Sequence, residues 1–200
     1  MYTDLPFIEN LKRRIPGLEK NWSRYKNMLR ERKIPPKTVL IRRGEYNKSI
    51  FIVRKGCLRI WFDDDGKDIT IAFFFENRVI GSLHSYRGTQ AASQFLLESV
   101  EATELYEISG EDAATLYREN DEFKEYLLEY TLERFDTYMR LFLSRIRESP
   151  ERRYLNLIKE QPDIISRVPQ HYIASYLGIT PVSLSRIRNR VWKEHKGKKD

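Results

Sequence analysis

The 200-residue sequence predicts an α+β fold: an antiparallel β-barrel or jelly roll, then a long helix, then a C-terminal helix-turn-helix domain. Three patterns predict it. Short apolar runs separated by turn residues recur about every ten residues over positions 38–110. A helical stripe of apolar residues runs through positions 121–149 without a proline, and two short helical patterns flank a glycine within positions 170–191.

The chain is expected to divide into four parts. These are N-terminal helices over residues 1–37, the β-barrel over 38–110, helices that include the long one over 111–149, and the helix-turn-helix domain over 150–200. In the first part, apolar residues three and four positions apart predict an amphipathic helix from Leu5 to Arg32, broken at Pro16-Gly17. Pro35-Pro36 then ends the helical region.

The barrel is expected to contain seven short strands. An Asp-Gly step within Asp63–Gly66 lies between two runs that alternate at period two, which predicts a hairpin. The expected strands are Val39–Ile41, Ile50–Val53, Leu58–Phe62, Ile69–Phe75, Val79–Ile80, Phe95–Val100 and Thr103–Ile108.

The long helix after Asp121 follows a shorter one capped by Ser109. A helix of about 27 residues is roughly 40 Å long, more than a barrel of this size can cover. Its apolar stripe, which includes Phe135 and Ile146, therefore favours dimerisation over packing against the chain's own strands. The expected dimer-interface residues are Phe123, Tyr126, Leu127, Tyr130, Tyr138, Leu141 and Phe142.

The net charge of +7 is unevenly distributed. Residues 1–37 hold ten basic and four acidic side chains, a net charge of +6, whereas residues 38–149 carry a net charge of −5. Residues 150–200 hold eleven basic and five acidic side chains, again +6. The C-terminal part is therefore the expected place of a polyanion contact, although the last lysines can equally be a solvated tail. The N-terminal excess has no explanation in the sequence.

Residues 170–191 predict a helix-turn-helix motif. Gly178 stands between the two helical patterns, Thr180 is a good N-cap, and Pro181 suits the first helical position. The second helix has a polar, basic face that suits the major groove of double-stranded DNA, although a helical hairpin with a solvated face is the alternative. The expected DNA-binding residues are Thr180, Val182, Ser183, Ser185, Arg186, Arg188, Asn189, Arg190 and Lys193, with Arg186 reading a base.

Two stretches resemble the Crp/Fnr superfamily of bacterial transcription regulators: TVLIRRGEYNKSIFIVRKGCLRIWFDDDGKDITIAFF in the barrel and IASYLGITPVSLSRIR near the C-terminus. The Thr-Pro step before the second helix is similar to a branch common in Bacteroidetes. The resemblance implies a cyclic-nucleotide-binding-like barrel, a dimerisation helix and a DNA-binding domain. It implies a homodimeric, sequence-specific regulator whose barrel holds an effector. The family's C-terminal β-hairpin wing is expected to be absent.

The resemblance also implies an effector pocket at Gly81, Ser82, Leu83, Ser93 and Gln94. In family members that bind cyclic AMP, a glutamate holds the ribose and an arginine neutralises the cyclic phosphate. Here Ser82 and Ser93-Gln94 stand in their places, so we do not expect cyclic AMP to be the effector.

Several other functions are not expected. Cys57 is the only cysteine, which excludes an intrachain disulfide and a cysteine-ligated iron–sulfur cluster. His84 is a conceivable haem ligand, but a lone histidine is usually a surface or packing residue, so no cofactor or metal is expected. The sequence lacks nucleophile and phosphate-loop motifs, which argues against an enzyme. No long apolar segment is present, so a cytoplasmic protein is expected. A ligand-sensing or scaffold module whose C-terminal helices bind protein is the alternative function.

Overall fold

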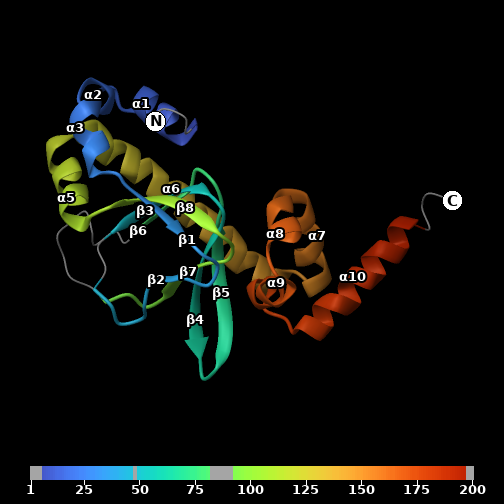
Figure 1. Ribbon diagram of the computed structural model, residues 1–200. Coiled ribbons are helices and arrows are strands. Elements are labelled where there is room, and N and C mark those ends of the chain that lie inside the picture. The colour runs from blue at the N-terminus through green and yellow to red at the C-terminus, as the bar shows by residue number, and fades with distance from the viewer. Residues whose placement is uncertain (1–5, 47–48, 82–91, 197–200) are drawn as a thin grey trace. The chain divides into compact units, whose positions relative to one another are not determined.

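The computed structural model describes residues 6–46, 49–81 and 92–196 (Figure 1). The chain forms two compact units. Unit 1 comprises Met1–Ile60 and Phe73–Phe135, and unit 2 comprises Trp61–Ala72 and Asp136–Asp200.

The N-terminal region is a series of short helices followed by a strand. The helices are α1 (Pro6–Arg14), α2 (Pro16–Lys20), α3 (Trp22–Tyr25) and the 3-10 turn η1 (Lys26–Met28). The expected break at Pro16 is confirmed, but a helix through Arg32 is wrong, because strand β1 already begins at Arg30. β1 pairs antiparallel with β8, and Arg32 Nη1 lies 2.9 Å from Glu107 Oε2. The partner strand is distant in sequence, so the local helical spacing does not reveal it.

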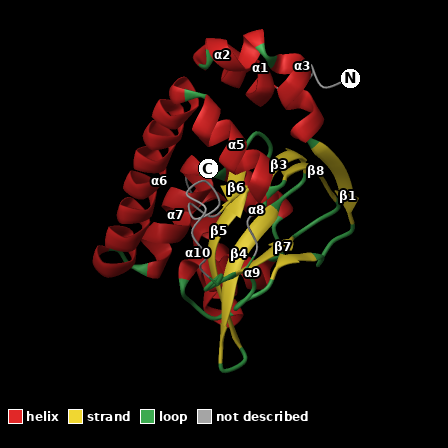
Figure 2. Cartoon of the chain, turned by 90° about the vertical axis from the view of Figure 1, so that its left-hand side faces the viewer, coloured by secondary structure: helices red, strands yellow, loops and turns green. Residues whose placement is uncertain are grey.

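The described strands form two four-stranded antiparallel sheets; seven of the eight lie where the sequence predicts a strand, and β1 is the one not predicted. Their orders are β1-β8-β3-β6 and β2-β7-β4-β5, and Figure 2 shows β4 and β5 as a long hairpin. The turn of that hairpin has positive φ at Asp65 and Gly66, with the Gly66 amide donating to Asp63 Oδ1 at 2.7 Å. The strands are β1 (Arg30–Ile34), β2 (Val39–Ile41), β3 (Ile50–Lys55), β4 (Leu58–Asp64), β5 (Lys67–Phe74), β6 (Val79–Gly81), β7 (Leu96–Ser99) and β8 (Thr103–Ile108).

The turn between β3 and β4 needs a glycine. Gly56 has φ +107°, and a Cβ there would lie 2.6 Å from Thr103 Oγ1 and 2.7 Å from the carbonyl oxygen of Ala102. We expect Gly56→Ala to lower the free energy of unfolding by about 2 kcal/mol, because conformational strain and a backbone clash add. Gly44→Ala is the matched control, because Gly44 has φ +82° but a methyl group added there meets open space. Denaturant titration is expected to show that this variant loses about 1 kcal/mol of unfolding free energy. Equal losses for the two variants would contradict the role of the clash.

Helices α5 (Gly110–Glu119) and α6 (Asp121–Arg147) follow the sheets. The expected Ser109 cap is confirmed, since the Asp112 amide donates to Ser109 Oγ at 3.1 Å. The first turns of α6 pack inside unit 1, where Phe123 is 8% exposed and joins the buried cluster of Ile15, Leu18 and α5 residues. Assigning Phe123 to a dimer interface is therefore wrong, because its own chain covers it.

Unit 2 contains the C-terminal helices, which are α7 (Pro150–Glu160), α8 (Pro162–Arg167), α9 (Gln170–Leu177) and α10 (Pro181–Lys196). α9 packs against α7, α8 and α10. Its Ser175 hydroxyl donates to the carbonyl oxygen of Asp68 at 2.7 Å and accepts from the Thr70 amide at 2.8 Å, which ties α9 to the hairpin segment of the same unit. No strand follows Ile108 among the described residues, so the part of the C-terminus described up to Lys196 contains no wing.

Candidate nucleic-acid interface and effector pocket

The turn between α9 and α10 has the geometry that its sequence predicts. Gly178 adopts φ +68°, and its amide donates to the carbonyl oxygen of Ser175 at 2.9 Å. The following amide, of Ile179, donates back to the carbonyl oxygen of Ala174 at 3.0 Å. These bonds satisfy carbonyls at the end of α9 that would otherwise lack partners. Three residues therefore connect the two helices, and α10 starts from a fixed position on α9.

One face of α10 is buried and holds the helix in place. Leu184, Ile187 and Val191 are three and four residues apart and all buried, so they lie on a single face of the helix. Ala174 in α9 is also fully buried, and its small side chain permits a close approach of the two helices. The rotation of α10 about its own axis is thereby determined by packing.

The opposite face of α10 is exposed and polar. Helical spacing places five exposed side chains together on it: Val182, Ser185, Arg186, Asn189 and Lys193. Arg188 lies at one edge of this face and is exposed as well. Ser185, Arg186, Arg188, Asn189 and Lys193 make no hydrogen bond or ion pair within the described part of the chain. These donors are therefore available to an external partner, and no acidic side chain stands among them.

Three of the expected DNA-binding side chains are engaged within the protein. The Ser183 amide donates to Thr180 Oγ1 at 3.1 Å, and the two hydroxyl oxygens lie 2.9 Å apart, so both residues cap the N-terminus of α10. Arg190 Nη1 lies 2.6 Å from Glu151 Oε2 in α7. These three residues position the helix. Neither the sequence spacing nor the local charge identifies Glu151 as a partner, because it lies 39 residues away.

The expected effector-pocket residues are only partly within the described residues, since Ser82 and Leu83 lie outside them. His84, the conceivable haem ligand, lies outside them as well. Gly81 ends β6 opposite Ile50 of β3. The hydroxyl of Ser93 donates to the carbonyl oxygen of Phe95 at 2.7 Å, so this side chain is used within its own turn. Gln94 is exposed. Among the described residues, no hydrogen bond joins Gly81, Ser93 and Gln94 to one another.

Unit 1 contains a buried ion pair that the sequence pattern does not predict. Arg59 of β4 and Glu98 of β7 have side chains that are 2% and 8% exposed, and Arg59 Nη2 lies 3.5 Å from Glu98 Oε2. The alternation of Leu58, Ile60 and Phe62 makes Arg59 look like a solvent-facing residue. The charged residue is instead buried because β4 is covered on both faces at its start, where the consecutive residues Leu58 and Arg59 are both buried.

The apolar side chains of α6 divide between two surroundings. Tyr126, Leu127 and Tyr130 are half-buried against unit 1, and the Tyr130 hydroxyl donates to the carbonyl oxygen of Val79 at 2.9 Å. Tyr138 and Phe142 are exposed, and Leu141 is half-buried. An exposed apolar stripe with alternating spacings of four and three residues runs along the helix, formed by Leu128, Leu132, Phe135, Met139, Phe142 and Ile146. This spacing is the heptad pattern of a coiled-coil seam.

The described residues contain neither a candidate metal-ion cluster nor a candidate membrane-spanning helix. Among the described residues, no cluster of three or more histidine, cysteine or acidic side chains could hold a metal ion. Cys57 is buried. No described helix is both long and apolar enough to cross a bilayer.

Known proteins share this architecture. Residues 31–120 match the family model described as cyclic nucleotide-binding domain. No curated protein matches the sequence significantly. FixK2 from Bradyrhizobium japonicum superposes with a TM-score of 0.74, at 15% sequence identity over 84% of this chain and 86% of that chain.

Two further solved structures are similar. The c-di-GMP-responsive global regulator CLP of Xanthomonas campestris has a TM-score of 0.69 at 16% identity, over 88% of this chain and 93% of that chain. A protein from Eubacterium rectale assigned to the Crp/Fnr family of transcriptional regulators has a TM-score of 0.69 at 19% identity, with 87% of each chain covered. Residues 31–120 are thus similar to the cyclic nucleotide-binding domain, and the chain shares the fold of Crp/Fnr regulators.

Proposed function

We propose that this protein is a homodimeric transcription regulator of the Crp/Fnr type that binds a specific sequence in double-stranded DNA. The observation that carries the proposal is the exposed face of α10. Its hydrogen-bond donors have no partners within the described residues, while packing against α9 fixes its direction. A helix presented in this way suits the major groove, where Arg recognises guanine and Asn recognises adenine.

Dimerisation is the second part of the proposal. The exposed stripe on α6 offers six apolar side chains at heptad spacing, and a second copy of the same helix is the natural partner for such a seam. Two α10 helices in a dimer would enter successive major grooves about 34 Å apart and read a pseudo-palindrome. Tyr138 and Phe142 stay in the proposed interface, with Leu141 at its edge.

The barrel is proposed to bind a small-molecule effector other than cyclic AMP. Ser82 and Ser93-Gln94 replace the charged pair that holds a cyclic nucleotide in related proteins, and the Ser93 hydroxyl is already bonded to the backbone. A phosphodiester without a cationic partner at these positions binds poorly. The CLP regulator responds to c-di-GMP, which illustrates that this fold accepts other effectors. We place the protein in the cytoplasm, where its DNA is.

Arg186→Ala tests the assignment of base contacts. We expect the substitution to cost about 1–3 kcal/mol of binding free energy at the preferred site and to relax specificity at one base pair. Arg188→Ala is the matched control from the edge of the same face. It is expected to weaken binding to all sequences alike and to reduce the slope of log K against log salt by about one. Fluorescence anisotropy with a panel of single-base variants at several salt concentrations measures both effects.

Two results would overturn this assignment. If Arg186→Ala weakens binding to every DNA sequence equally, Arg186 contacts phosphate and not a base. If the wild-type protein retards no promoter fragment in a gel shift, the face of α10 serves another partner, and the alternative of a protein-binding module applies.

A further inference from the structure

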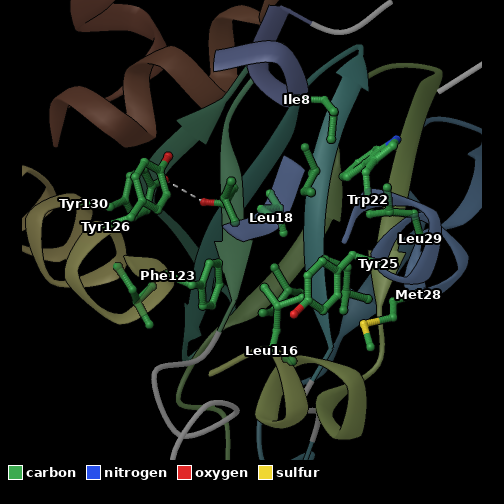
Figure 3. A pocket seen from close by; sticks show the side chains of 16 residues that line it. Ile8, Leu18, Trp22, Tyr25, Met28, Leu29, Leu116, Phe123, Tyr126 and Tyr130 are labelled. Carbon is green, nitrogen blue, oxygen red and sulfur yellow. Dashed lines mark hydrogen bonds between the residues drawn. The ribbon is translucent and has the colours of Figure 1, made fainter. Parts of the chain in front are cut away.

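Unit 1 contains an apolar cavity (Figure 3). It lies among the N-terminal helices, α5, the first turns of α6 and strands β3, β6 and β8. None of Gly81, Ser93 and Gln94 lines it. The lining residues are Ile8, Leu18, Trp22, Tyr25, Met28, Leu29, Ile50, Ile52, Val79, Ile108, Ala113, Leu116, Phe123, Tyr126, Leu127 and Tyr130.

The cavity suits a single aromatic ring. Its volume is about 70 Å³. A cavity needs about 10–15 Å³ of this volume for each water, so this one has room for about five waters. In liquid water, five molecules take up about 150 Å³. That liquid volume is comparable to one six-membered ring with a small substituent. Five of the sixteen lining side chains are aromatic and none is charged, and rings favour edge-to-face and offset contacts with other rings.

The charges around the cavity are balanced, which favours a neutral ligand. Three cations lie over aromatic rings of the lining: Lys12 Nζ at 4.6 Å from the Trp22 ring, Arg14 Cζ at 5.5 Å from Tyr126, and Arg24 Cζ at 5.9 Å from Tyr25. Each of these cations also has a carboxylate partner, in the pairs Lys12–Glu9, Arg14–Glu129 and Arg24–Glu119. A charged ligand would enter an apolar space without a counter-charge of its own.

One polar group in the lining lacks a partner. Tyr25 is 5% exposed, and its hydroxyl forms no hydrogen bond within the described part of the chain. Figure 3 shows this hydroxyl among the lining side chains, whereas the hydroxyl of Tyr130 is bonded to Val79. Burial raises the pKa of Tyr126, so the surroundings favour neutral groups. The Tyr25 hydroxyl keeps some contact with solvent and can form a hydrogen bond with a bound polar group.

We propose that this cavity binds a small, neutral, monocyclic aromatic molecule that carries one hydrogen-bonding group. The ring packs among Phe123, Leu116 and the other apolar side chains, and the polar group pairs with the Tyr25 hydroxyl. This site is independent of the proposed DNA contact, because all of its residues belong to unit 1.

Phenol and toluene are matched probes, since they differ only in a hydroxyl and a methyl group. NMR titration of the full chain is expected to show saturable shifts with both, with Kd values on the order of 1 mM. Ala113→Leu places a larger side chain in the cavity and is expected to weaken both probes at least about tenfold. Ala114→Leu is the control on the next residue of α5, which does not line the cavity, and is expected to leave both affinities within about twofold.

Tyr25→Phe separates the polar contact from the apolar one. It is expected to weaken the binding of phenol by about three- to tenfold and to leave the affinity for toluene unchanged. This variant also keeps the test open if Ala113→Leu does not fold. The proposal is overturned if neither probe gives saturable shifts, if Ala113→Leu folds and binds as the wild type does, or if Tyr25→Phe weakens the two probes equally.

Discussion

Leu132→Lys is expected to convert the proposed dimer into a monomer and to lower affinity for a two-half-site DNA by at least about 100-fold, the size of a lost avidity. Leu132 is exposed in the single chain and is the second of the six residues in the heptad stripe on α6. The substitution therefore leaves the folded monomer intact, because surface changes of this kind cost little stability. In a dimer the same position would face a second helix, and two ammonium groups would be buried against an apolar seam.

Glu133→Lys is the matched control, since it places the same side chain on the next residue of α6, away from the stripe. Sedimentation velocity is expected to show a dimer for this variant and for the wild type, and a monomer for Leu132→Lys. Circular dichroism and thermal unfolding establish that each variant is folded. A wild-type protein that sediments as a monomer, or a Leu132→Lys variant that remains dimeric, would contradict the proposed seam.

In the long helix α6, sequence periodicity predicts the bounds of the helix but not which of its apolar residues are buried. The Ser109 cap, the length of α6 and the break before α7 follow from local sequence, and all three are present. The surroundings of each apolar residue do not follow. Phe123 and Ile146 are both apolar residues of the same helix, yet one is covered by the N-terminal helices and the other is exposed. Only the tertiary fold separates the two sets.

The N-terminal charge excess is another feature that depends on long-range contacts. Four basic residues of the N-terminal segment form ion pairs with glutamates of the acidic middle segment, in the pairs Arg14–Glu129, Arg24–Glu119, Arg32–Glu107 and Lys33–Glu104. Exposed pairs of this kind contribute little stability. They do account for much of the opposite charge of the two segments, which composition alone leaves unexplained.

The proposed DNA-binding site is the part that local sequence predicts best. Gly178, Thr180 and Pro181 act through the backbone and its nearest neighbours, so their roles can be predicted from local rules. Arg190 is the exception because its partner Glu151 belongs to another helix. The barrel interior is harder to predict, since an alternating strand buried on both faces can hide a charge such as Arg59.

Glu98→Ala is expected to lower the free energy of unfolding by about 3–5 kcal/mol, because it leaves the Arg59 guanidinium buried without its carboxylate. The two side chains are almost fully covered, so water cannot replace the lost partner without opening the barrel. Glu104→Ala is the control from a neighbouring part of the sheets. Glu104 pairs with Lys33 and Arg54 at a partly exposed position, and its loss is expected to cost at most about 1 kcal/mol.

The double variant Arg59→Met with Glu98→Leu removes both charges of the pair and keeps the side-chain volume. Both charges are replaced by apolar side chains of similar size, so the stability is expected to return to within about 2 kcal/mol of the wild type. Denaturant unfolding of Arg59→Met, Glu98→Leu and the double variant completes a mutant cycle, and the coupling free energy is expected to offset most of the loss in Glu98→Leu. If the double variant is as unstable as Glu98→Ala, the polar contacts of the pair stabilise the barrel, because the volume of the two side chains is kept. A Glu98→Ala loss no larger than that of Glu104→Ala would instead mean that the Arg59 charge reaches water in solution, and that the interior of the barrel is open to a polar ligand.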